Sequence, residues 1–370
     1  MLTLYLLILI LSLASSWLIL WKVPFIPQKS SLKNQERKLS IIIPARNEAT
    51  NLPVLLKSIA IQKDKPYEVL VVDDDSTDNT AQVAKDYGAQ VITFIRDKNH
   101  WLGKSAACWA GAQAAQGDYL LFLDADVFLS QENSLVSIVQ EFQSLNEQGI
   151  LSIQPYHIVK KGYENLSAVF NIIVLVGMNR FSFFQNKLKV AGAFGPSLLV
   201  RRDTYFNVGG HAISREAMMD HVELGKAFLE KDLPVNLYGG KGSLNFRMYP
   251  DGLVYLSEGW SKSFATASLS THPIIVIGIS LFIAGAFFSF CLPIYFVLLN
   301  DWTATIISFI GYLIYYTHFY RMARLAGIFH WQPLIIYPIL FVFFVGLFIW
   351  SLIKTFIFKR VSWKGRDISL

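Results

Sequence analysis

Two runs of carboxylates are the part of this chain best suited to chemistry. The first is DDDSTD at residues 73–78, and the second is DAD at residues 124–126; each follows a short apolar run. Carboxylates held this close repel one another, and the repulsion raises their pKa values unless a cation or hydrogen-bond donors intervene. A hydrated divalent cation that bridges a diphosphate would resolve the repulsion. The pattern therefore predicts a divalent cation bound together with a nucleotide-sugar.

Each run alone also has an ordinary structural explanation. Residues 74–78 could be a turn that leads into a helix, where acidic side chains favour the helix dipole. The DAD run has a common loop composition, and Lys104, at the start of an expected helix, could be a solvated side chain. The case for a site depends on these residues occurring together at the ends of strands.

The elements that position these runs alternate along the chain. Apolar runs at 39–43, 67–72, 90–94 and 119–123 predict strands, and the spacing at 49–61, 76–87 and 104–115 predicts helices. Such alternation indicates an α/β fold, with a mostly parallel sheet and helices on both faces. Ligands of these sheets bind at the carboxyl ends of the strands, where both acidic runs and the PARNE run at 44–48 fall.

Long apolar segments flank this region. The chain has 370 residues, 53% of them apolar, and segments 2–20, 274–299, 303–320 and 334–353 are nearly free of charge. Each meets the length of about 20 residues that a membrane-spanning helix requires. We therefore expect an anchor at 1–21, a catalytic domain at 38–272, membrane helices at 273–353 and a basic tail at 354–370.

The distribution of charge predicts the orientation of these segments. Lys22, Lys29 and Lys38 follow the first segment, so the positive-inside rule predicts a multi-pass protein of the plasma membrane whose catalytic domain is cytoplasmic. The first segment could instead be a signal peptide, although no basic residue precedes it. A full span at 334–353 would leave the basic tail outside, so Pro333 and Pro338 could make this segment re-entrant or broken.

Other features narrow the possible functions. Residues 163–184 are apolar and aromatic; we expect a helix at the membrane interface or along the acceptor site, with a further span as the alternative. Cys108 and Cys291 are the only cysteines, which suits a reducing cytoplasm. The net charge of +6 is concentrated beside the membrane segments, so a nucleic-acid partner is not expected.

The order of four runs resembles glycosyltransferase family 2. They are PARNE at 44–48, VDDDSTD at 72–78, GK at 103–104 and DAD at 124–126, and the resemblance covers roughly residues 38–270. Runs QPYH at 154–157, GP at 195–196, GGH at 209–211, EGWSK at 258–262 and WKGR at 363–366 resemble the membrane-anchored members that glycosylate carotenoid acids such as 4,4'-diaponeurosporenoate. The resemblance implies a GT-A type fold, a UDP-sugar donor and a single inverting displacement.

The resemblance also implies roles for the residues near the donor nucleoside. Pro44, Arg46 and Glu48 match positions that line the nucleoside end of the site. Asp74 matches the family aspartate that meets the base, and Asp73 lies beside it.

Three further positions match the diphosphate end. Lys104 would approach the nucleotide or the diphosphate, and Asp124 would meet the ribose or the sugar. Asp126, with Asp124, would hold Mg²⁺ or Mn²⁺. A cation placed there stabilises the charge that builds on the leaving nucleotide.

The expected base differs from the usual family pattern. The family usually shows Glu-Asp before Val-x-Leu-Gly, whereas residues 219–225 read MDHVELG, so His221 stands at the base position and Asp220 at the preceding acid. Histidine is a competent base. An acceptor that is itself a carboxylic acid is already ionised, which would relax the demand for a base. The alternative is that Asp220 and His221 form a helix cap.

Residues 257–262, near the end of the region that resembles the family, bear on the acceptor. Polysaccharide synthases of the family carry Gln-x-x-Arg-Trp where this chain has SEGWSK at 257–262, so transfer of a single sugar is expected. Trp260 and Lys262 are candidates for acceptor binding, although Trp260 could simply anchor at the interface. The apolar segments favour a lipid-soluble acceptor, first a carotenoid carboxylate and otherwise a ceramide, sterol, diacylglycerol or polyprenyl phosphate. A membrane scaffold with a decayed transferase domain is the alternative from another class.

Overall fold

The structure is a computed structural model of the whole chain, in which two compact units interleave along the sequence. It describes residues 2–29, 37–93, 101, 103–185, 187–215, 219–262 and 264–358, and the backbone alone of 360–363 and 366–369. The sheet unit comprises Pro24–Tyr156 and Gly192–Arg247, and the helical unit comprises Met1–Val23, His157–Ala191 and Met248–Leu370. Phe94 of the third expected strand, and Lys364 and Gly365 of the basic tail, lie outside the described residues.

A seven-stranded sheet forms the sheet unit, in the order β3-β2-β1-β4-β8-β6-β9. Neighbours β1 and β2, β1 and β4, β2 and β3, and β6 and β9 are parallel, whereas β8 is antiparallel to β4 and β6. The expectation of a mostly parallel α/β sheet is confirmed. The seven strands are β1 (Leu39–Ala45), β2 (Glu68–Asp73), β3 (Gln90–Thr93), β4 (Tyr119–Leu123), β6 (Ile150–Gln154), β8 (Ser197–Arg201) and β9 (Val235–Gly239).

Helices cover both faces of the sheet. α4 (Lys104–Ala114) packs so closely on β1 that a Cβ on Gly111 would lie 2.5 Å from Ile42. Tyr119 of β4 packs instead against Phe142 of α5 (Ser134–Ser144), with ring centroids 5.6 Å apart. Ile42 is in register with Phe122, whose side chain points to the face opposite that of Tyr119. α4 and α5 therefore lie on opposite faces.

The remaining elements of the sheet unit are short. Strand β5 pairs antiparallel with β10 in a second, four-stranded sheet of order β11-β7-β10-β5, and residues of β7 (Tyr156–Ile158) are divided between the two units. The others are α2 (Leu52–Ala60), α3 (Thr80–Asp86), β5 (Val127–Leu129), α7 (Arg202–Val208), η2 (Gly210–Ser214), α8 (Asp220–Glu230) and β10 (Leu244–Phe246).

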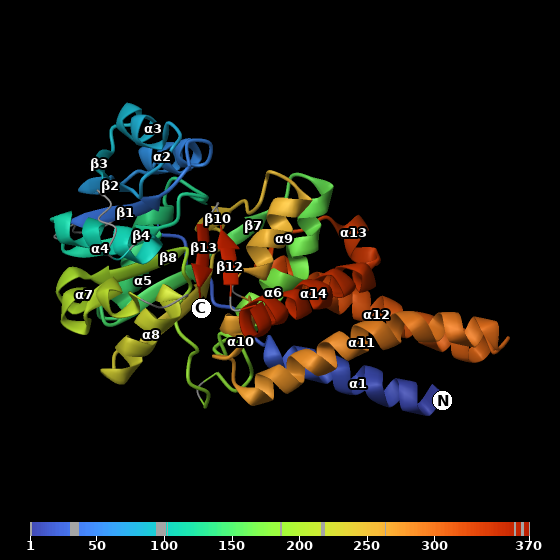
Figure 1. Cartoon of the computed structure of the whole chain (residues 1–370). Helices are drawn as coiled ribbons and strands as arrows, with labels where there is room; N and C mark the ends of the chain where they lie inside the picture. Colours follow the sequence, from blue (N-terminus) through green and yellow to red (C-terminus); the bar gives the residue numbers. More distant parts are fainter. Residues whose placement is uncertain are drawn as a thin grey trace. The chain divides into compact units, whose positions relative to one another are not determined.

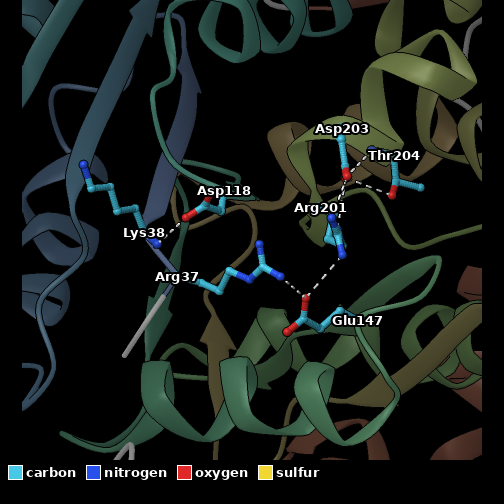
Figure 2. Close-up of polar contacts among 7 residues, drawn as sticks. All are labelled: Arg37, Lys38, Asp118, Glu147, Arg201, Asp203 and Thr204. Atoms are coloured by element: carbon cyan, nitrogen blue, oxygen red, sulfur yellow. Dashed lines mark hydrogen bonds and ion pairs between the residues drawn. The ribbon is translucent and has the colours of Figure 1, made fainter. Parts of the chain in front are cut away.

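The amino edge of the sheet, where β1 and β4 begin, carries a network of ion pairs (Figure 2). Glu147 lies 3.6 Å from both Arg37 and Arg201, and Arg201 also pairs with Asp203 at 2.6 Å. Because β8 is antiparallel to β4, its last residue, Arg201, lies opposite Tyr119 at the start of β4. Pairs this exposed contribute little to stability. The acidic runs lie at the opposite edge of the sheet, where β2 and β4 end.

The helical unit consists mainly of long apolar helices. Within the described residues, three have the length and apolarity to cross a membrane: Leu2–Ile19, Pro273–Leu298 and Tyr337–Phe358. The fourth expected span, at 303–320, lies within the 25-residue helix α12, whose last turns carry Arg321 and Arg324, and α12 is not among these three. The elements are α1 (Leu2–Ile19), η1 (Gly162–Ser167), α6 (Ala168–Gly177), α9 (Leu253–Ser261), α10 (Phe264–Ser268), α11 (Pro273–Leu298), α12 (Trp302–Ala326), β11 (Gly327–Ile328), α13 (Trp331–Ile335), α14 (Tyr337–Leu352), η3 (Ile353–Phe358), β12 (Arg360–Trp363) and β13 (Arg366–Ser369).

Helix α1 packs against other helices rather than standing alone. It runs beside α11 in Figure 1 and also contacts α12. The Tyr5 hydroxyl donates to the Ser308 carbonyl (3.0 Å), and the Ser15 hydroxyl donates to the Gly278 carbonyl (3.0 Å). Small residues at such crossings allow close approach of helices in a membrane.

Residues 163–184 do not form a span. Their helical part, Gly162–Gly177, is shorter than a membrane requires, and most of the α6 side chains are buried within the helical unit. The segment is therefore an interior element of that unit. Its apolar composition reflects burial against protein.

Candidate active site

The loops after β1 and β2 are joined by hydrogen bonds at the carboxyl edge of the sheet. The Arg46 guanidinium donates to the carbonyls of Asp74 (2.7 Å) and Asp75 (3.1 Å). The Asn47 N–H donates to the Ser76 hydroxyl (3.0 Å), and the Asn47 side-chain oxygen accepts from the Thr77 N–H (2.8 Å). These contacts use backbone groups of Asp74, Asp75 and Thr77, which explains why α3 begins at Thr80 and not at the expected residue 76.

Two carboxylates of the first acidic run support the loop itself. Asp73 accepts from the Ser76 N–H (3.3 Å), and Asp78 accepts from the Ala49 N–H (3.1 Å) and from the Thr80 N–H (3.0 Å). Burial alone would raise the pKa of Asp78, but the hydrogen bonds from Thr80 and Ala49 outweigh it and lower the pKa. The turn explanation therefore accounts for part of this run.

Lys104 and Asp124 meet where α4 begins and β4 ends. The Lys104 ammonium lies 2.5 Å from Asp124 Oδ1 and donates to the Gly195 carbonyl (3.0 Å). The Asp124 N–H donates to the Pro196 carbonyl (3.1 Å). Burial alone would lower the pKa of Lys104, but the carboxylates of Asp124 and Asp220 outweigh it and raise the pKa. Lys104 therefore stays charged in the physiological range.

Asp126 lies in the turn that links β4 to β5. The Val127 N–H donates to the Asp124 carbonyl (3.2 Å), which holds Asp124 and Asp126 on the same turn, and both are partly exposed. No cluster of three or more acidic, histidine or cysteine ligands occurs among the described residues. Mg²⁺ is usually held by one or two carboxylates together with substrate phosphates, so this pair fits a cation that arrives with a diphosphate.

Asp220 and His221 open helix α8. Asp220 Oδ1 accepts from the His221 N–H (2.8 Å) and lies 3.1 Å from His221 Nδ1. Asp220 is 8% exposed, and within the described part of the chain its Oδ2 has no hydrogen-bond partner. Burial alone would raise the pKa of Asp220, but His221, Lys104 and His211 together lower it, so Asp220 stays ionised. The cap explanation does not describe this geometry: Met219 is the residue that caps α8, it makes no side-chain cap hydrogen bond, and the N–H that Asp220 accepts is that of the next residue.

The structure brings four of the expected site residues together. Lys104 interacts with the charges of Asp124 and Asp220, and Asp220 interacts in turn with His221. The residues expected at the nucleoside end occupy the neighbouring strand ends and loops: Pro44, Arg46, Glu48, Asp73 and Asp74.

Trp260 and Lys262 belong to the helical unit. The Trp260 ring is 6% exposed, stacks on Phe170 with centroids 4.7 Å apart, and donates its N–H to the Ser167 hydroxyl (3.0 Å). Lys262 caps the end of α9. Trp260 is thus a core residue of its unit.

Sequence reasoning gave no role to Gly195, Pro196 and His211. The two carbonyls of Gly195 and Pro196 receive Lys104 and Asp124, and a Cβ on Gly195 would lie 2.9 Å from His221 Nδ1. The Gly-Pro and Gly-Gly-His runs were visible in the sequence, but only the antiparallel strand β8 brings them to this edge. His211 is 1% exposed, and the charges of Asp220 and Lys104 influence its pKa.

Comparisons with known proteins agree with this geometry. The model of the family described as "Glycosyl transferase family 2" matches residues 40–206. A 4,4'-diaponeurosporenoate glycosyltransferase of Staphylococcus aureus (strain USA300) is 37% identical over 344 residues, which cover 92% of this chain and 90% of that protein. A mannosyltransferase from Pyrobaculum calidifontis, solved with GDP-Man and Mn²⁺, has a TM-score of 0.52 at 14% identity and covers 94% of this chain and 95% of its own. The structural likeness is one of fold.

Proposed function

Because the chain belongs to glycosyltransferase family 2 and has its GT-A type fold, we propose that it moves one sugar from a UDP-sugar to a lipid-soluble acceptor. The single observation that carries this proposal is the meeting of Lys104, Asp124, Asp220 and His221 at the carboxyl edge of the sheet. That edge is where α/β sheets bind nucleotides. The joined loops after β1 and β2 supply a surface for the nucleoside, with Pro44, Arg46, Glu48, Asp73 and Asp74 on it.

The diphosphate end of the site carries the charges that transfer requires. Asp124 and Asp126 would hold Mg²⁺ or Mn²⁺ together with the donor diphosphate. When bound, the cation supplies positive charge at the oxygen that leaves with the nucleotide. The Lys104 ammonium, fixed by Asp124 and Gly195, adds a compact positive charge to the same region.

His221 and Asp220 would receive the acceptor on the other side of the sugar. If the Nδ1–H of His221 donates to Asp220 Oδ1, the lone pair lies on Nε2, which can take a proton from an incoming hydroxyl. Asp220 then orients the ring. Asp220 itself is held ionised and is a weak base, so an acceptor that arrives as a carboxylate places the smallest demand on this pair.

A carotenoid carboxylate is the acceptor we propose. The 37% identity to a glycosyltransferase named for a carotenoid acid supports it, as do three helices apolar enough to cross a membrane. Lys22 and Lys29 follow α1, so we place the enzyme in the plasma membrane with its active site in the cytoplasm. A ceramide, sterol, diacylglycerol or polyprenyl phosphate is the alternative acceptor.

Transfer by membranes that contain the protein tests this proposal. Membranes are incubated with a panel of labelled nucleotide sugars, Mn²⁺ and either a carotenoid acid or a total lipid extract, and mass spectrometry identifies the labelled lipid. We expect UDP release and a glycosyl ester of the carotenoid acid. If the labelled product is instead a lipid glycosylated on a hydroxyl group, the proposed acceptor is wrong. If no sugar is transferred from any donor, the proposed function is contradicted.

A further inference from the structure

The Gly209-Gly210 pair delivers His211 to the interior of the site. Gly210 has φ of +52°, and a Cβ there would lie 2.5 Å from the ring of Tyr205 and 2.8 Å from Trp109. Only glycine fits at this approach. The following residue, His211, lies on η2, which packs against both α4 and α8, the helices that begin with Lys104 and Asp220. Its ring also contacts Phe122 of β4, two residues before Asp124 (centroids 5.0 Å apart).

Hydrogen bonds to Tyr205 determine the tautomer of His211. The Tyr205 oxygen accepts from the His211 backbone N–H (3.0 Å) and lies 2.8 Å from His211 Nδ1. Tyr205 is fully buried, and no other acceptor for its hydroxyl proton occurs in the described ranges. The hydroxyl therefore donates to Nδ1, because a buried donor is normally satisfied. The ring hydrogen must then be on Nε2.

His211 is neutral under physiological conditions. Burial lowers its pKa to about 4, and the charges of Lys104 and His221 act in the same direction, whereas Asp220 opposes them. A neutral ring with its hydrogen on Nε2 is a hydrogen-bond donor without charge. It can bind an uncharged polar group without attracting an anion.

Two polar side-chain atoms make no hydrogen bond within the part of the chain that the structure describes, and one of them, on Asp220, is fully buried. One is the Nε2–H of His211, a donor, and the other is Oδ2 of Asp220, an acceptor. The charge of Asp220 acts on His211, although no direct hydrogen bond joins the two side chains. Leaving the buried Oδ2 of Asp220 without a hydrogen-bond donor would destabilise the fold. A hydroxyl group satisfies both at once, because it accepts one hydrogen bond and donates another.

We propose that His211 Nε2–H and Asp220 Oδ2 together bind one hydroxyl group of the transferred sugar, so that His211 determines which sugar is accepted. This inference rests on the proposed function. Asp220 Oδ2 needs a hydrogen-bond donor, which an ionised carboxylate or phosphate lacks, and the nucleoside belongs to the loops after β1 and β2. Among the parts of the donor and the acceptor, the sugar is the one that presents several hydroxyls.

Two variants of His211 distinguish the contributions of its two ring nitrogen atoms. H211N keeps a polar group at the level of Nδ1, where Tyr205 donates, but has nothing that reaches Nε2. H211Q places an amide N–H near Nε2 and loses the group that faces Tyr205. Both are compared with the wild type by thermal unfolding in detergent and by binding of UDP alone, which carries no sugar.

The measurement is transfer from the UDP-hexose that gives product in the donor panel and from its monodeoxy analogues. We expect the wild type to lose roughly 10- to 100-fold in kcat/KM when one particular hydroxyl is missing. In H211N, the parent and that analogue should become nearly equal, and H211Q should keep part of the difference. UDP binding should be the same in all three proteins.

The outcomes distinguish this inference from the proposed function. A uniform loss of kcat/KM over all analogues in H211N, with the ratio between them unchanged, would mean that a water or nothing fills the gap and would overturn the inference. So would an unchanged H211N. If the wild type neither binds UDP nor transfers any sugar, the proposed function fails first and the inference fails with it.

Discussion

At the scale of the residue, the site depends on a few charges that hold one another in place. Lys104 is ionised because Asp124 and Asp220 surround it, and Asp220 is ionised because Lys104 and His221 face it. Residue types and order were enough to predict these four positions. Their mutual contacts were not predictable, because an ion pair between residues 104 and 124 requires the ends of a particular helix and strand to meet.

Substitution K104M tests the role of the ammonium. It removes the charge next to Asp124 while keeping most of the side-chain volume, so we expect kcat/KM to fall by roughly 100-fold, as when one preorganised electrostatic contact to the transition state is lost. The matched control is K85M, on the exposed surface of α3. Steady-state transfer kinetics decide. Equal activity of the two variants would remove Lys104 from the mechanism.

The buried His211 predicts a pH dependence of stability. Its pKa is about 4 when folded and near 6.5 when unfolded, so the unfolded chain binds the proton more strongly. The contribution to stability is full above about pH 6.5 and is lost as the pH falls toward 4, by up to about 3 kcal/mol. We expect the Tm of the wild type to fall more between pH 7 and pH 4.5 than the Tm of H211Q. If the Tm of the two proteins changes with pH in the same way, His211 is in contact with solvent.

At the scale of the element, strand ends assemble the site and one antiparallel strand completes it. The acidic runs were predictable because the carboxyl ends of parallel strands share an edge. The part played by Gly195 and Pro196 was not, because β8 inserts between β4 and β6 from far along the chain. The pairing of β8 depends on non-local contacts that periodicity does not reveal.

Substitution G195A tests the loop before β8. The added methyl would lie 2.9 Å from His221 Nδ1, so the ring must move away from Asp220, and we expect kcat to fall by about 10-fold or more with UDP binding retained. G162A is the control, since a Cβ there meets nothing within 4 Å. Transfer kinetics together with UDP binding decide. An unchanged kcat in G195A would show that the position of His221 has no bearing on transfer.

At the scale of the whole molecule, the apolar helices form a packed unit of their own. The sequence predicted the existence of these segments from length and composition. It could not predict that α1 packs on α11 and α12, because the hydrogen bonds of Tyr5 and Ser15 join residues from opposite ends of the chain. The first helix is thus part of a folded unit and does more than tether the enzyme.

Two glycine substitutions on apolar helices test this packing. A side chain at Gly285 of α11 would collide with Ser12 of α1, whereas a Cβ at Gly346 of α14 meets nothing within 4 Å. We expect G285L to destabilise the protein by roughly 1–3 kcal/mol and G346L to leave its stability nearly unchanged. Thermal unfolding in detergent measures both. Equal melting of the two variants would mean that α1 is only loosely attached.

The most direct test of the account is the metal dependence of UDP binding in the wild type and in D126A. Asp124 and Asp126 share one turn, and the account requires them to hold a divalent cation against the donor diphosphate. We predict that Mn²⁺ strengthens UDP binding to the wild type and has no effect on D126A, which also loses transfer. Full, Mn²⁺-dependent binding and transfer by D126A would contradict the account.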